Sequence, residues 1–232
     1  TVALIDHLKD TRMRVALVTL LAVILASLLY TQSRASYLAV VPTFLVISLM
    51  SRRRFYLLAA LIVALVLSPL VAPRVARERI AHTFTQQEQE GQLKVGKLRL
   101  DTSASARIMG YKEALSDWRK RPMLGYGITG RKFVDAQYPR ILVETGIVGM
   151  LAFGWLILGI FHVGLTSWRE QQDDLLRGLS VGLLAGLVGL LVHAIGANTF
   201  IIVRIMEPFW FVTGIVIALA QMNDETIHAP SV

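Results

Sequence analysis

Ionisable residues cluster where a polar stretch of this 232-residue chain meets an apolar one. In the segment KFVDAQYPRILVETGIVGMLAF, residues 132–153, Asp135, Arg140 and Glu144 precede a long apolar run. A carboxylate can accept a proton from a reacting hydroxyl group, and the planar donor fork of arginine suits a phosphate. Because charges at the edge of a membrane are costly and tend to be functional or paired, these three residues are candidates for a site.

Two further arginines lie in apolar surroundings. Arg34 occurs in TQSRASYLA and Arg204 in NTFIIVRIMEPFW, where Glu207 follows three residues later. Arg34 either binds an anion or extends to the lipid head groups, and Arg204 either binds an anion or pairs with Glu207 on one helix face. His193, in an apolar stretch, is interpreted as a structural histidine of the core.

The composition indicates what kind of chain carries these residues. It is 54% hydrophobic with a mean hydropathy of +0.56, in long apolar blocks, which is typical of an all-α polytopic membrane protein. The chain has no cysteine, and its five histidines show no metal-ligand spacing, so we expect no disulfide, no metal site and no cofactor. The start at Thr1 suggests the C-terminal part of a longer membrane protein.

Six apolar segments are predicted to span the membrane. They cover residues 15–30, 37–50, 55–72, 141–165, 178–199 and 205–222. The second is short for a span, so a re-entrant or interfacial helix is the alternative there. The chain then divides into transmembrane helices one to three (1–72), a long loop (73–140), transmembrane helices four to six (141–222) and a tail (223–232).

The lysines and arginines near these segments predict the orientation. They precede the first span, separate the second from the third, and separate the fourth from the fifth, so with six spans they share one side. By the positive-inside rule that side, and the tail, are cytoplasmic. Arg34, Arg204 and the long loop then lie on the opposite, extracytoplasmic side, where we expect the arginines to converge on a lipid-linked diphosphate.

The long loop is strongly basic. It holds 14 of the 24 basic residues, which favours anionic membrane lipids or a phosphorylated substrate, and we expect no nucleic acid on that face. Ile108, Tyr111, Leu115 and Trp118 have helical spacing and predict an amphipathic helix over about residues 104–120. The glutamine-rich residues 83–96 are predicted to be irregular or partly helical.

Four stretches resemble the O-antigen ligase/polymerase family, bacterial membrane enzymes that ligate or polymerise glycans. They are TQSRASYLA, SARIMGYKEALSDWRKRPMLGYGI, DAQYPRILVETGIVGMLAF and IVRIMEPFWFVTGI. The third is the most specific. It resembles the family element His-Asn-x-Tyr-Leu followed by Leu-x-Glu-x-Gly-x-x-Gly, with matches at residues 135, 138, 142, 144, 146 and 149.

The resemblance implies an activity and its partners. Members form GT-C-like helical bundles in the bacterial inner membrane and perform inverting, metal-independent glycosyl transfer on the periplasmic face. The donor is an undecaprenyl-diphosphate-linked glycan, and the acceptor is a hydroxyl of a growing glycan or of the lipid A core. Such reactions belong to O-antigen or exopolysaccharide assembly, so other polysaccharide-assembly proteins are further expected partners.

The resemblance also assigns roles to residues. Asp135 is the expected base, and Glu144 is either a second catalytic carboxylate or a structural residue. Four arginines are expected to stabilise or bind the diphosphate: Arg34, Arg107, Arg140 and Arg204. Tyr138 either stacks on a sugar or lies at the membrane interface, and Gly146 and Gly149 are expected to allow close helix packing.

One departure from the family pattern bears on the reaction. Histidine is usual where this chain has Asp135, and leucine where it has Pro139, which favours polymerisation over ligation to the lipid A core. Two other classes remain open. In a transporter or flippase the arginines would line a pathway, although no internal repeat is visible. A scaffold membrane protein would not need the charged constellation.

Overall fold

The structure is a computed structural model that describes residues 2–7, 10–31, 33–51, 53–71, 94–95, 98–99 and 102–228. Within these ranges the regular secondary structure is helical apart from one short pair of antiparallel strands, which confirms the predicted all-α class. The elements are α1 (Val2–His7), α2 (Thr11–Tyr30), α3 (Arg34–Met50), α4 (Arg54–Val71), β1 (Lys94–Val95), β2 (Leu98–Arg99), α6 (Thr102–Lys120), α7 (Gln137–Glu170), α8 (Asp174–Gly196) and α9 (Val203–His228).

Four helices in the described ranges are long and apolar enough to cross a membrane: α7, α8, Thr11–Leu28 of α2 and Val203–Gln221 of α9. The other two predicted spans coincide with α3 and α4, whose apolar stretches Ala35–Met50 and Arg54–Val63 are shorter. The six-span topology therefore stays a prediction, with four spans supported by length and composition. Residues 83–93 lie outside the described ranges, and the antiparallel pair β1 and β2 was not predicted.

Helix α8 is the centre of the bundle and contacts α1, α3, α7 and α9. Gly182, Gly189 and Gly196 repeat every seven residues along it, so they lie on one face. This face meets Ala3 of α1 and the α3 residues Thr43 and Ala35, so the small side chains allow close helix packing. Other α8 side chains form the apolar core with α7 and α9, including the buried Leu183 and Leu187.

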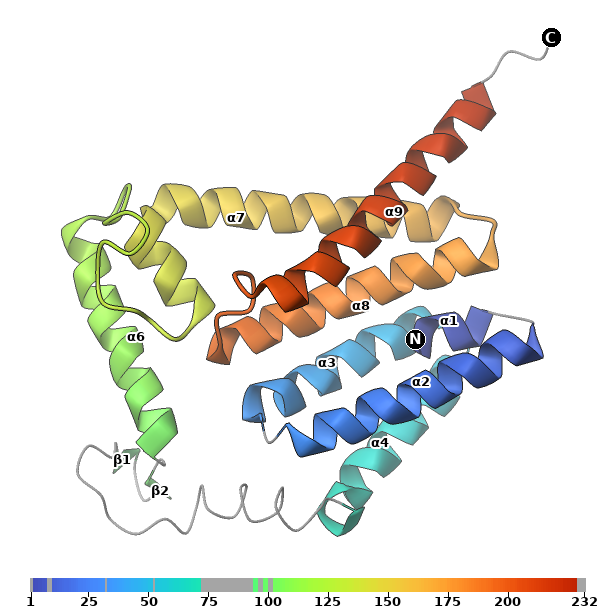
Figure 1. Cartoon of the computed structure of the whole chain (residues 1–232), viewed down its shortest axis with the longest axis horizontal. Helices are drawn as coiled ribbons and strands as arrows, with labels where there is room; N and C mark the ends of the chain where they lie inside the picture. The colour runs from blue at the N-terminus through green and yellow to red at the C-terminus, as the bar shows by residue number, and fades with distance from the viewer. Residues whose placement is uncertain are drawn as a thin grey trace.

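The two ends of the bundle differ (Figure 1). The starts of α2, α4 and α8 and the ends of α3 and α7 lie at one end, and these are the helix ends next to the predicted cytoplasmic arginines. At the opposite end α6 runs crosswise to α7 and α8. A helix that crosses the ends of apolar helices suits a position along the membrane surface.

Helix α7 is broken at Gly146, where φ is 66° and ψ is −162°. Essentially only glycine adopts this conformation. Residues 137–145 and 147–170 are therefore two helices in different directions, and Figure 1 shows the bend. The fourth predicted span, residues 141–165, lies within the candidate span Gln137–Glu170 and contains this break, which was not predicted.

The loop that follows α6 fills this break with its own backbone. Tyr126 and Gly127 donate N–H groups to the carbonyls of Val143 and Glu144, at 2.8 and 2.9 Å. In return, Ile147 and Val148 donate to the carbonyls of Pro122 and Met123, at 2.8 and 3.3 Å. These four bonds satisfy groups that a broken helix leaves without partners.

The close approach of the two backbones explains two glycines. A Cβ atom on Gly125, which has φ of 65°, would lie 2.5 Å from the Val143 carbonyl oxygen. One on Gly146 would lie 2.7 Å from the Leu124 nitrogen and closer still to the Met123 carbonyl. The prediction that Gly146 and Gly149 allow helices to pack is therefore wrong. Gly146 makes the break, and Gly149 makes room for the Thr145 side chain.

We expect Gly146→Ala to destabilise the protein, because alanine is strained at this φ and its methyl group would strike the loop backbone. The loss in free energy of unfolding should exceed about 1 kcal/mol. Thermal unfolding of the purified protein in detergent checks this. Gly154→Ala and Gly159→Ala are matched controls, since both lie in the straight part of α7 with open space around them, and they should be neutral or slightly stabilising. An equal loss in a control would contradict this account of Gly146.

Candidate functional site

A cleft of about 640 Å³ lies between α6 and residues 131–136, at the end of the bundle that α6 crosses. Its apolar lining includes Met109, Ala114 and Val143. Six charged residues also line it: Arg107, Glu113, Asp117, Arg131, Lys132 and Asp135. A cleft with a few charged groups on an apolar wall is a common form of ligand site.

Helix α6 is held in place by Tyr111. Its hydroxyl donates a 2.6 Å hydrogen bond to the carbonyl of Ile195, in the last turn of α8, where helix carbonyls lack partners within the helix. Arg107 lies one turn earlier on the same face of α6. Burial raises the pKa of Tyr111, and the positive charge of Arg107 opposes that rise. Arg107 forms no ion pair with any described residue, so its charge is available in the cleft.

Asp135 is exposed in the cleft and has no hydrogen bond or ion pair in the described part of the chain. The backbone around it is held firmly. The Asn198 side chain donates to the Val134 carbonyl at 2.9 Å, and the Gln137 side chain accepts from the Phe200 N–H at 3.0 Å. The turn between α8 and α9 therefore fixes the residues on both sides of the aspartate.

Arg140 and Glu144 bind each other on the first helix of α7, with 2.9 Å between Nε and Oε1. Both side chains are largely buried, at 13% and 20% exposure. The Arg140 guanidinium also lies 5.0 Å from the centre of the Phe133 ring. These contacts favour the structural alternative for Glu144, and they leave Arg140 already compensated instead of free for a phosphate.

The side chain of Tyr138 also makes contacts within the protein. Its hydroxyl donates to the Leu191 carbonyl of α8 at 2.6 Å, and its ring meets Phe153 edge to face with the centroids 6.5 Å apart. Tyr138 therefore anchors the first helix of α7 on α8. His193 contacts the buried Thr199 with 2.7 Å between Nδ1 and Oγ1, in agreement with its structural interpretation.

Of the remaining two arginines, Arg204 does not line the cleft. Arg204 is exposed in the first turn of α9, and the alternative pairing with Glu207 is not formed, because no ion pair joins these two described residues. Arg34 begins α3, but its side chain is outside the described part. Of the seven predicted site residues, Arg107 and Asp135 line the cleft.

Four other charged residues of the cleft were missed by sequence reasoning. Arg131 pairs with Asp117, and Lys132 pairs with Glu113 at 3.6 Å. The hydrogen bond from Arg131 is the main reason that the pKa of Asp117 is lowered. The sequence contains one indication of these residues, because two basic residues end the glycine-rich loop in the motif GRK and acidic residues recur along α6. Spacing alone does not predict, however, that the two groups pair across the loop.

The described residues include no group of three or more side chains that could hold a metal ion. The comparison with curated proteins gives no match, and neither does the comparison with solved structures. A family model described as O-antigen ligase matches residues 17–154, more than half of the chain, and this range contains α6, the glycine break and every charged residue of the cleft. The chain belongs to the O-antigen ligase family, whose members are glycosyl-transfer enzymes of the membrane.

Proposed function

We propose that the cleft transfers a glycan from undecaprenyl diphosphate to a sugar hydroxyl, as a step of surface polysaccharide polymerisation. The observation that carries the proposal is the placement in one cleft of a carboxylate, Asp135, and an arginine, Arg107, neither of which has an ion-pair partner among the described residues. In the reaction the acceptor oxygen attacks the anomeric carbon from the face opposite the diphosphate. The new C–O bond forms as the bond to the diphosphate breaks.

Each free charge suits one half of this reaction. The acceptor hydroxyl loses its proton to the Asp135 carboxylate, which is exposed and accepts no other hydrogen bond from the described residues. The departing diphosphate takes the electron pair of the broken bond, and the Arg107 guanidinium stabilises the charge that develops on it. Arg131 and Lys132 line the same cleft, and the charge of each is compensated by an acidic partner on α6.

A second groove suits the apolar chain of the donor. It has a volume of about 480 Å³ and lies between α6 and residues 138–142, with apolar side chains such as Ile108, Leu115 and Leu142 along it. Tyr111 and Ala114 border both the groove and the charged cleft. A lipid diphosphate in the cleft would thus have a place for its chain within reach.

The cleft is proposed to face the periplasm. It lies at the end of the bundle away from the helix ends that carry the basic clusters, and the positive-inside rule places those clusters in the cytoplasm. The aspartate in place of the family histidine favours polymerase over ligase.

Deletion of the gene in its host tests the reaction class. A polymerase mutant should accumulate single lipid-linked repeat units, because the units can no longer be joined. Mass analysis of the lipid-linked glycans checks this, with the restored gene as control. Accumulation of long lipid-linked chains would instead assign the chain as a ligase, and single units confined to the cytoplasmic face of the membrane would favour the transporter.

We expect Asp135→Asn to lower polymer formation by about 10²-fold or more, because the amide cannot take the proton. Glycan chain length in the complemented deletion strain is the measurement, with the amount of membrane protein checked alongside. Glu207→Gln is a matched control, since Glu207 is exposed on α9 away from the cleft and should retain full activity. Normal chain length in the Asn variant would remove Asp135 as the base.

Substitution of Arg107 should affect activity, whereas substitution of Arg140 should affect stability. Arg107→Gln should keep thermal stability but lose about 10²-fold of activity, because only a transition-state contact disappears. Arg140→Gln should lose stability, because it leaves the largely buried Glu144 carboxylate without its partner. The double variant Arg140→Gln/Glu144→Gln should recover stability, with a coupling energy of roughly 0.5–3 kcal/mol, and should recover activity with it. A stable but inactive double variant would show that Arg140 does act on the substrate.

A further inference from the structure

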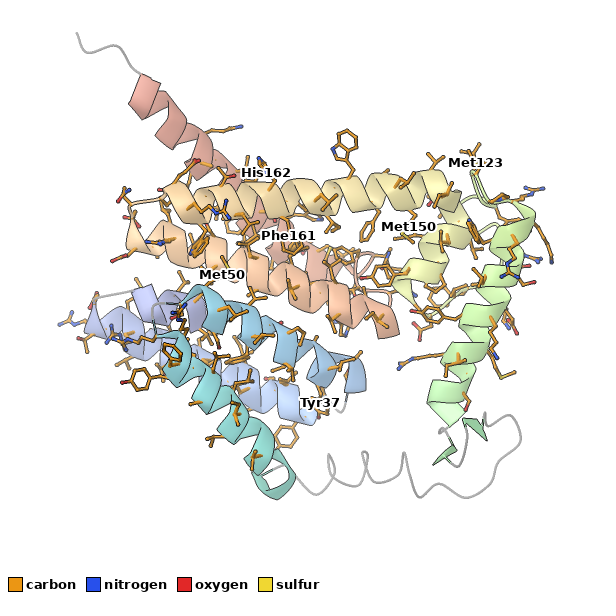
Figure 2. The ribbon with its side chains drawn as sticks, turned by 180° about the vertical axis from the view of Figure 1, so that it is seen from behind. Tyr37, Met50, Met123, Met150, Phe161 and His162 are labelled. Atoms are coloured by element: carbon orange, nitrogen blue, oxygen red, sulfur yellow. The ribbon has the colours of Figure 1, made fainter. Side chains whose placement is uncertain are left out.

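The loop between α6 and α7 exposes an apolar tip, formed by Met123, Leu124 and Ile128. Their side chains are 62%, 72% and 76% exposed, which is unusual for three large apolar residues of one short water-facing loop. Figure 2 shows Met123 at the edge of the molecule, beside the bend of α7. The tip contributes nothing to the cleft, so the proposed reaction does not explain it.

The tip continues the lipid-facing side of α7. The loop is bonded to α7 at Ile147 and Val148. From there an exposed apolar stripe runs along one face of the helix at helical spacing, through Val148, Leu151, Trp155 and Leu158. The Met123 carbonyl accepts a hydrogen bond from the Val148 N–H, so the apolar tip adjoins the first residue of this stripe.

The length of α7 places the tip at the boundary of the bilayer. Residues 147–166 contain no Asp, Glu, Lys or Arg, and Arg169 and Glu170 follow shortly after. At about 1.5 Å per residue this stretch is about 30 Å long, which equals the thickness of the hydrocarbon core. The hydrocarbon on the cleft side therefore ends near Ile147, where the loop is attached.

The base of the loop is basic. Residues 113–133 contain five basic residues against the two acidic residues Glu113 and Asp117, so a net positive charge remains after the pairing of Lys132 and Arg131. The basic residues are Arg119, Lys120, Arg121, Arg131 and Lys132. Arg121 and Arg131 both lie over the Tyr126 ring, at 4.9 and 5.1 Å from its centre, so the loop holds their charges together. Basic residues beside an apolar tip are complementary to anionic head groups above acyl chains.

We propose that this loop inserts its tip into the leaflet on the cleft side, with its basic base on anionic phospholipid head groups. The insertion goes beyond glycan transfer and does not depend on it. Because the same loop fills the Gly146 break and continues into the cleft wall at residues 131–136, insertion fixes the height of the cleft above the acyl chains.

The absence of cysteine in the sequence allows a direct test with single nitroxide labels. Leu124→Cys and Ile128→Cys are labelled in the full chain, reconstituted in phosphatidylcholine nanodiscs with and without phosphatidylglycerol. Collision rates with oxygen, which enters lipid, and with a nickel chelate, which stays in water, are measured. Leu151→Cys on the stripe and Glu113→Cys in the cleft are the lipid and water references.

We expect both tip labels to favour oxygen severalfold over the Glu113 label, and to move further toward the Leu151 value when phosphatidylglycerol is present. Tip labels that collide with nickel as often as the Glu113 label would overturn the insertion. Labels that are immobile and reach neither reagent would overturn it too, since they would indicate a protein partner at the tip. Equal depth in the two lipids would overturn the role of the anionic head groups.

Discussion

The break in α7 at Gly146 is the constraint on which the cleft depends. A helix interrupted near a bilayer leaves backbone groups without partners, and each such group would cost several kcal/mol in hydrocarbon. Residues 122–127 remove that cost with four backbone hydrogen bonds, which require the bare backbones of Gly125 and Gly146. The end of α6, the loop and the first helix of α7 are thereby held as one unit, and the cleft lies on it.

Helix α8 holds this unit in position through hydrogen bonds to its last turns. Tyr138 and Tyr111 donate to the carbonyls of Leu191 and Ile195, which are one turn apart on α8. The turn after α8 adds the Asn198 bond to the segment that carries Asp135. A helix that contacts α1, α3, α7 and α9 is a rigid base, so the parts of the cleft contributed by loops take their positions from the core of the bundle.

The sequence predicted the helices, because they follow from hydrophobic periodicity and segment length. It predicted fewer of the features that depend on contacts between distant segments of the chain. The apolar helices and the helix near residues 104–120 follow from local patterns, and the resemblance singled out Arg107 and Asp135. Gly146 was misinterpreted because a glycine in an apolar run suits a packed helix as well as a broken one. The Arg140–Glu144 pair was visible as an i, i+4 spacing, whereas the bond from Asn198 to Val134 joins segments 64 residues apart.

Ion pairing within the cleft distinguishes Arg107 and Asp135 from the other charged residues of its lining. Arg131 and Lys132 are matched by Asp117 and Glu113, so four of the six charges in the lining compensate one another. Were those cations unpaired, the cleft would be strongly positive and would attract anions with little selectivity. Compensation leaves one cation and one carboxylate without partners among the described residues, Arg107 and Asp135. A transfer that releases a diphosphate and a proton requires one group of each kind, and this match is the physical basis for proposing that the reaction takes place in this cleft.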